Sequence, residues 1–213
     1  MITTIWKRRK YLEEFITRWL AQPEIDEMII WDNSGEYRPA VIDGRIKIIN
    51  SSHNYGSYVR DVVSHFAKNN VMIICDDDIL VEPGFVTDML KYYSDDMLLG
   101  VWGREFGKSY GNSPTIIANR IKEPVEVDFV IGLLWIINRK YLFPIDHRDF
   151  KWTCYDLHFN GELKKQYPQV KRMIIPTDKW HQTEEEVDKW ALNQHPDALK
   201  EKQELFERYF ANV

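Results

Sequence analysis

Cysteine is scarce in this sequence. Only Cys75 and Cys154 occur among 213 residues, and each stands beside apolar or aromatic neighbours. So small a number excludes a framework of disulfides, and the apolar surroundings favour free, buried thiols in a reducing compartment. We therefore expect a cytoplasmic protein, of a cell or of an infected host cell.

Long apolar segments are missing as well. The longest uncharged apolar run covers residues 129–137, which is far short of the roughly 20 residues that cross a bilayer. Near the start of the chain, residues 11–20 contain Glu13, Glu14 and Arg18, and these charges argue against a secretory signal. We expect no membrane span and interpret 129–137 as a buried strand.

Positive charge is not in excess either. Lysine and arginine number 28 against 33 aspartates and glutamates, which gives a net charge of −5. A negative overall field repels nucleic acids and anionic membranes, so we expect no nucleic-acid partner. The one dense basic cluster covers residues 7–10, and any polyanion must therefore be bound locally.

The sequence does contain a regular alternation of apolar strands and amphipathic helices. Its hydrophobic fraction of 44% suits one compact domain. Strands are predicted at residues 2–6, 28–31, 46–49 and 71–75, and helices at 12–20 and 56–66. In the second helix we expect an inward face made of Val59, Val62, Val63 and Phe66. This pattern predicts an α/β fold with a mixed, mainly parallel central sheet flanked by helices.

The second half of the chain is less regular. Further strands are predicted at residues 98–102 and 129–137, and two polar helical stretches follow Pro176. The last of these covers residues 196–210 and is expected to pack on the domain. Its predicted apolar stripe consists of Leu199, Leu205, Phe206, Tyr209 and Phe210.

Three aspartates, Asp76, Asp77 and Asp78, directly follow the fourth predicted strand. Side chains alternate in an extended chain, so Asp76 and Asp78 should converge while Asp77 turns away. Two carboxylates about 5 Å apart repel by roughly 3 kcal/mol at an effective dielectric near 20. A divalent cation, Mn²⁺ or Mg²⁺, offsets this repulsion and also binds phosphate oxygens. The alternative is a solvated acidic turn or a helix cap.

Two other strand ends carry candidate ligand-binding residues, because ligands of parallel sheets lie beyond the carboxyl ends of the strands. Arg8 follows the first strand and can form a charge-assisted contact with a diphosphate. Asp32 follows the second strand and can accept a hydrogen bond from the imide N–H of uracil, which makes uridine diphosphate the favoured ligand. The alternatives are a solvated arginine and an Asx turn before Gly35.

An ordered set of segments extends this pattern. It consists of TTIWKRRKYLEEFITRW, IIWDNSG, IICDDDILVEPGF, VDFVIGLLWIINRKYL and CYDLHFNGEL. With these segments in this order, the chain resembles GT-A nucleotide-sugar glycosyltransferases, and among them exostosin-type domains, especially those of bacteria or large algal viruses. The resemblance implies one Rossmann-like GT-A domain over residues 1–213. We divide it into a nucleotide-binding half (1–100), an acceptor-side half (101–183) and C-terminal helices (184–213).

The resemblance also implies roles for individual residues. Asp78 resembles the direct metal ligand, and Asp76 the residue that contacts ribose or assists the metal. Arg60 matches a position that often faces the nucleotide, and His181 matches a histidine that completes the metal shell or touches phosphate. Asp156 matches an acidic residue near the reacting sugar. For His181 an ordinary surface or core position, and for Asp156 a helix N-cap, stay open as alternatives.

The function expected from these features is metal-dependent transfer of a sugar from a UDP-sugar to a hydroxyl of a glycan or glycoprotein acceptor. Exostosin-type ancestry implies retention of configuration. Inversion would instead need a carboxylate base, which Asp156 or Asp128 can supply. Two alternatives stay open: a non-catalytic binding module, and a nucleotidyltransferase, although residues 3–10 lack the glycines of its phosphate loop.

Overall fold

The computed structural model describes residues 1–145, 154–183 and 197–211. The first half of the chain forms β1 (Ile2–Ile5), α1 (Leu12–Leu20), β2 (Met28–Asp32), β3 (Ile46–Asn50), α2 (Val59–Ser64), β4 (Val71–Asp76), β5 (Ile79–Val81), α3 (Phe85–Leu90) and β6 (Met97–Gly100). The second half forms β7 (Trp102–Arg104), η1 (Tyr110–Asn112), β8 (Thr115–Ile117), η2 (Ala118–Arg120), β9 (Val125–Glu126), β10 (Phe129–Val130), β11 (Leu134–Asn138), η3 (Arg139–Tyr141), α4 (Tyr155–Gln166), β12 (Lys171–Ile174), β13 (Trp180–Gln182) and α5 (Ala198–Tyr209).

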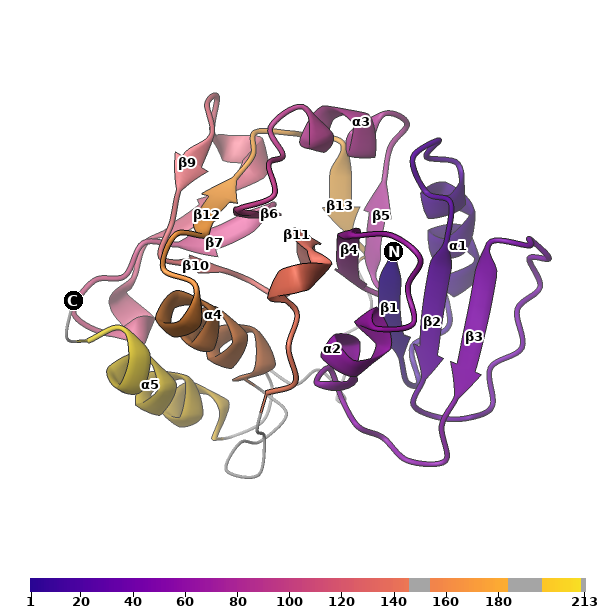
Figure 1. Cartoon of the computed structure of the whole chain (residues 1–213), viewed down its shortest axis with the longest axis horizontal. Helices are drawn as coiled ribbons and strands as arrows, with labels where there is room; N and C mark the ends of the chain where they lie inside the picture. The colour runs from indigo at the N-terminus through magenta and orange to yellow at the C-terminus, as the bar shows by residue number, and fades with distance from the viewer. Residues whose placement is uncertain (146–153, 184–196, 212–213) are drawn as a thin grey trace.

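An eight-stranded sheet in the order β3-β2-β1-β4-β11-β6-β12-β9 forms the centre of the molecule. Strands β3, β2, β1 and β4 are parallel, and β11 is antiparallel to both β4 and β6. Helices α1 and α2 lie on opposite faces of the parallel part (Figure 1). The predicted α/β fold with a mixed, mainly parallel sheet is confirmed.

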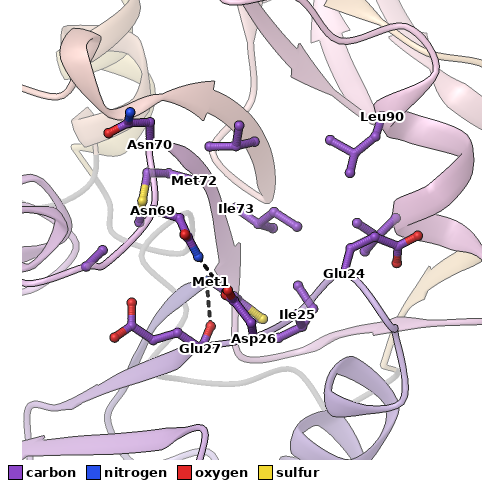
Figure 2. Close-up of a pocket in the computed structure, with 13 residues that line it drawn as sticks. Met1, Glu24, Ile25, Asp26, Glu27, Asn69, Asn70, Met72, Ile73 and Leu90 are labelled. Carbon is purple, nitrogen blue, oxygen red and sulfur yellow. Dashed lines mark hydrogen bonds between the residues drawn. The ribbon is translucent and has the colours of Figure 1, made fainter.

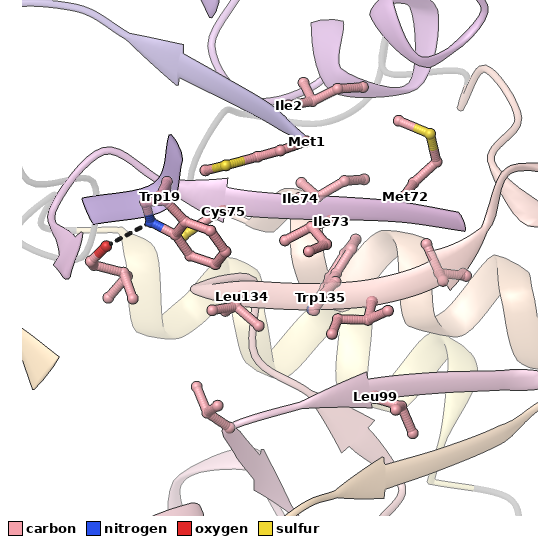
Figure 3. Packing of buried hydrophobic residues seen from close by; sticks show 14 of the residues in the cluster. Met1, Ile2, Trp19, Met72, Ile73, Ile74, Cys75, Leu99, Leu134 and Trp135 are labelled. Atoms are coloured by element: carbon pink, nitrogen blue, oxygen red, sulfur yellow. Dashed lines mark hydrogen bonds between the residues drawn. The ribbon is translucent and has the colours of Figure 1, made fainter. Parts of the chain in front are cut away.

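Apolar continuity explains why the first four strands were predictable. Strand β4 is buried from Met72 to Cys75, and β2 is buried from Met28 to Ile30, because helices cover both faces of the sheet. Figure 3 shows the resulting core, in which Trp19 of α1 lies beside the sheet and donates its indole N–H to the Ile79 carbonyl. Both cysteines are free and buried, as predicted.

Helix α2 differs from the prediction. It covers only Val59–Ser64, and two of its expected inward residues are exposed, Val62 by 48% and Phe66 by 61%. The buried face instead includes Arg60 and Asp61. Val59 and Val63 are buried as predicted, and the two polar residues share the inner face with them because their partners lie on the sheet and on α4. Val62 and Phe66 turn to the outside.

The predicted strand 129–137 is two strands in two different sheets. Strand β10 pairs with β7 in a three-stranded sheet, whereas β11 lies in the central sheet. The break falls at Gly132, whose N–H and C=O bind side chains of other elements instead of a neighbouring strand. An uninterrupted apolar run gave no sign of this break.

The C-terminal helix α5 packs beside α4 over a small second core (Figure 1). Leu205, Phe206 and Phe210 are buried there, as predicted, but Leu199 is 63% exposed. The other predicted C-terminal helical stretch falls largely within residues 184–196, which lie outside the described residues. Within the described residues, no helix is long and apolar enough to cross a membrane.

Candidate active site

The carboxyl ends of the parallel strands bring the predicted polar segments together. Ile5 pairs with Asp32, and Thr4 pairs with Asp76, so the ends of β1, β2 and β4 lie at one edge of the sheet. The loop 6–11 leaves β1 at this edge (Figure 1). The predicted clustering of strand ends is therefore confirmed.

Arg8, in this loop, binds two of the three aspartates. Its Nη2 donates to Asp77 Oδ1 at 2.6 Å, and its Nη1 donates to Asp78 Oδ2. The Arg8 side chain is 31% exposed, whereas those of Asp77 and Asp78 are 4% and 7% exposed. The prediction that Asp77 turns away from Asp78 is wrong, because Arg8 binds both carboxylates. Strand β4 ends at Asp76, and the turn that follows cancels the alternation of side chains.

Asp76 has a different partner, Arg60 on α2. The Arg60 guanidinium donates to Asp76 Oδ1 through Nη2, to Thr4 Oγ1 at 3.1 Å and to the Gly132 carbonyl at 3.3 Å. Arg60 is only 3% exposed. It therefore holds Asp76 in place. The resemblance had implied that Arg60 faces the nucleotide, but its guanidinium is bound to Asp76, Thr4 and Gly132.

Strand β13 covers the other side of the acidic turn and was not expected there. It is antiparallel to β5, and Gln182 donates from Nε2 to Asp78 Oδ2 at 2.9 Å. The backbone N–H of Thr183 also donates to the Asp78 carbonyl at 2.8 Å. Successive side chains of a strand point to opposite faces. Because Gln182 faces Asp78, the structure does not bring His181 to the predicted metal ligands Asp78 and Asp76.

Asp156 reaches the same edge of the sheet through the β10–β11 connection. Its Oδ2 accepts from the Gly132 N–H at 3.0 Å, and the next residue, Leu133, accepts from the Asp76 N–H at 2.9 Å. Asp156 lies in the first turn of α4, whose N-cap is Cys154, so the alternative role of N-cap is wrong. Its other oxygen accepts from the Leu157 N–H at 2.8 Å.

Asp128, the second candidate base, lies in a different environment. Its Oδ2 accepts from the Phe106 N–H at 2.9 Å, and Arg172 and Lys164 are charged neighbours. Within the part of the chain that the structure describes, none of these residues contacts the aspartates at the end of β4. The geometry therefore favours Asp156 over Asp128 as a group near the acidic turn.

Asp32 is buried and forms the Asx turn that was the alternative to a uracil contact. Its Oδ1 accepts from the N–H and hydroxyl of Ser34, at 2.8 and 2.6 Å, and its Oδ2 accepts from the Tyr37 N–H at 2.6 Å. Burial opposes its charge, but these hydrogen bonds lower the pKa of Asp32 below its ordinary value. Gly35 has φ +70°, and a Cβ there would lie 2.6 Å from the Ser51 carbonyl oxygen, so the turn requires glycine.

Sequence comparison shows to which family this chain belongs. Residues 1–161 match the profile of glycosyl transferase family 2. The chain belongs to glycosyl transferase family 2. No curated protein matches it in a sequence search. The narrower resemblance to exostosin-type domains stays a prediction.

A family 2 domain with this fold also resembles solved structures. The crystal structure of GalNAc-T7 with UDP, GalNAc and Mn²⁺ aligns with a TM-score of 0.70 at 11% sequence identity. The alignment covers 97% of this chain and 47% of that one, so the chain spans about half the length of its structural relative. At this identity the similarity shows the fold, a GT-A domain.

The acidic turn of the family 2 domain offers a donor for a cation. Asp78 Oδ1 is buried and has no hydrogen-bond partner among the residues that the structure describes. Among the described residues, no three His, Cys, Asp or Glu side chains form a metal-ligand set. Mg²⁺ and Mn²⁺ commonly bind one or two carboxylates together with substrate phosphates. The donor set therefore fits a cation shared with a phosphate ligand better than one enclosed by protein.

Burial and mutual repulsion perturb the charged groups of this turn. Burial, and then the charges of Asp78 and Asp76, raise the pKa of Asp77 to about 7, although Arg8 lowers it. Burial also raises the pKa of Asp76. Burial opposes the charge of Arg8, but the three aspartates outweigh it and raise the pKa of Arg8. The three aspartates of the acidic turn therefore stabilise a positive charge placed beside them.

A cavity of 370 Å³ lies elsewhere, beside the amino ends of β1 and β4 (Figure 2). Carboxylates line it, but Asp26 accepts from Asn69 at 2.6 Å and Glu27 accepts from Lys47 at 2.5 Å. Ligands of parallel sheets bind at the carboxyl ends. We therefore assign the candidate active site to the acidic turn and not to this cavity.

Proposed function

We propose that this family 2 domain transfers a sugar from a UDP-sugar to a hydroxyl of a glycan or glycoprotein acceptor, with Mn²⁺ or Mg²⁺ as cofactor. The observation that carries the proposal is Asp78 Oδ1, in an acidic turn at the ligand-binding edge of the sheet. This carboxylate oxygen is buried and has no hydrogen-bond partner within the described part of the chain. Asp78 would hold the cation, which when bound supplies Lewis-acid stabilisation of the departing diphosphate.

The other residues of the turn have distinct roles in this proposal. Arg60 fixes the Asp76 carboxylate from below the surface, and Gln182 donates to one oxygen of Asp78, so that the other oxygen stays available. Arg8 is the partly exposed cation that can reach the diphosphate. Preorganised charges of this kind stabilise negative charge that develops as the donor bond breaks.

Uridine as the base rests on Asp32 at the end of β2, and on the UDP in the GalNAc-T7 crystal structure, which shares the fold. Because Asp32 is 0% exposed, a uracil contact requires the loop 33–37 to open. A thermal-shift comparison of UDP, CDP and GDP with Mn²⁺ tests this choice. Equal shifts for all three would overturn the assignment to uridine.

Asp156 is the candidate base that an inverting reaction would need. Retention, as the exostosin-type resemblance implies, needs no protein base, whereas inversion needs a carboxylate behind the anomeric carbon. Asp156 is the carboxylate linked to the acidic turn through Gly132 and Leu133. NMR of the first product formed decides between the two. An inverted product, together with at least about a hundredfold loss of turnover in Asp156→Asn, would assign the base.

The experiment that tests the function is incubation with UDP-sugars and Mn²⁺. We expect slow release of UDP that a glycan acceptor accelerates, which a pure binding module or a nucleotidyltransferase would not give. Asp78→Asn should abolish both Mn²⁺-dependent UDP binding and turnover. Asp178→Asn, at an exposed aspartate before β13, is the matched control and should behave as wild type. Unchanged activity in Asp78→Asn would refute the site.

A further inference from the structure

Arg8 binds the two carboxylates that a cation would also bind, and its guanidinium is the group that a diphosphate would bind. Its two terminal nitrogens bridge Asp77 Oδ1 and Asp78 Oδ2, so one guanidinium serves both buried carboxylates. The remaining oxygen of Asp78 is the proposed cation ligand. A cation bound there would lie beside the Arg8 guanidinium, and the two positive charges would repel each other.

The second arginine of the cluster cannot move in the same way. Arg60 is 3% exposed and is fixed by Thr4 and Gly132 as well as by Asp76. Arg8, by contrast, is 31% exposed on the loop 6–11 between β1 and α1. Of the two arginines bound to the acidic turn, Arg8 is therefore the one that can reach outward, while Arg60 stays with Asp76.

We propose that Arg8 is an internal counterion of Asp77 and Asp78 that transfers to the diphosphate of the donor when the cation binds. This inference rests on the proposed function. It makes cation and nucleotide binding synergistic, because the cation displaces Arg8 from the carboxylates and the diphosphate receives it. Without nucleotide the cation has to compete with Arg8, so the domain should bind Mn²⁺ weakly until UDP is present.

The test is calorimetric titration of Mn²⁺ and of UDP, each alone and in the presence of the other. Wild type should bind Mn²⁺ at least about fivefold more tightly with UDP than without it. In Arg8→Gln, Mn²⁺ alone should bind about tenfold more tightly than in wild type, and the synergy with UDP should shrink. Arg9→Gln is the matched control, because it removes the same charge from a neighbour that binds Ser34 and not the aspartates.

The outcomes separate this inference from the proposed function. Mn²⁺ affinity without UDP that is unchanged or weaker in Arg8→Gln, while wild type binds Mn²⁺ and UDP, would overturn the counterion role alone. Wild type that binds neither ligand would overturn the proposed function as well. If Arg8→Gln fails to fold by circular dichroism, Arg8→Lys replaces it. An ammonium cannot bridge both carboxylates as the guanidinium fork does, so Mn²⁺ alone should again bind more tightly than in wild type.

Discussion

Asp61, on α2, is a buried carboxyl whose titration should control the stability of the domain. It is 1% exposed, and its Oδ1 accepts from the Tyr155 hydroxyl at 2.5 Å. Its Oδ2 is buried and has no hydrogen-bond partner in residues 1–145, 154–183 and 197–211. Burial raises the pKa of Asp61 to about 8, although Tyr155 and the charge of Arg60 lower it. At neutral pH the folded state therefore keeps a proton that the unfolded chain releases.

The sign of the effect follows from the direction of this shift. The folded-state pKa is above the unfolded value of 3.8, so the folded state binds more protons between these two values and stability falls as pH rises across that window. The contribution is complete below about pH 4 and is lost as pH rises through about 8. At about 1.4 kcal/mol for each pKa unit, the upper limit is about 6 kcal/mol.

The assay is urea unfolding of wild type and Asp61→Asn from about pH 5 to about pH 9. The asparagine keeps the shape and the acceptor for Tyr155 but cannot titrate, so the loss of stability with pH should be much smaller in the variant. Glu36→Gln, which replaces an exposed carboxylate, should show the wild-type slope. Equal slopes in wild type and Asp61→Asn would refute the raised pKa and the burial that causes it.

Two further predictions test other contacts. Gln182→Ala removes a donor to Asp78 and should weaken Mn²⁺ binding in the presence of UDP by about tenfold or more. In the same titration His181→Ala should have no effect. If His181→Ala weakened Mn²⁺ binding and Gln182→Ala did not, the pairing of β13 with β5 would be shifted by one residue. Gly161→Ala places a Cβ 2.4 Å from the ring of Tyr209 where α4 meets α5, and should cost about 1–3 kcal/mol in thermal unfolding. An unchanged melting temperature would contradict this close approach.

The sequence predicted the parallel half of the fold because its signals are local. Strands such as Val71–Asp76 are short apolar runs, and the helix Leu12–Leu20 has a clear apolar face. Parallel order then brings the residues after each strand to one edge, which is why Arg8 and Asp78 could be expected at the same ligand-binding edge. That expectation needed no knowledge of distant contacts.

Polar burial on α2 could not be predicted in this way. The hydrophobic pattern predicted that Val62 and Phe66 are buried, but both are exposed, and Arg60 and Asp61 are buried instead. A charged side chain is stable inside only when it has a partner or loses its charge. The partner of Arg60 is on β4 and that of Asp61 is on α4, and neither could be identified before the fold was known.

The details of the site that were missed have the same physical origin. Asp76 meets Arg60 across 16 residues of sequence, Gly132 meets Asp156 across 24, and Gln182 meets Asp78 across 104. In the last case a shift of one residue in the pairing of β13 with β5 would exchange His181 for Gln182 at the acidic turn. The type of chemistry is therefore set by short segments at strand ends, whereas the choice of supporting residue is set by long-range register. For this reason the paired variants Gln182→Ala and His181→Ala are a sharper test of the site than any substitution of the aspartates themselves.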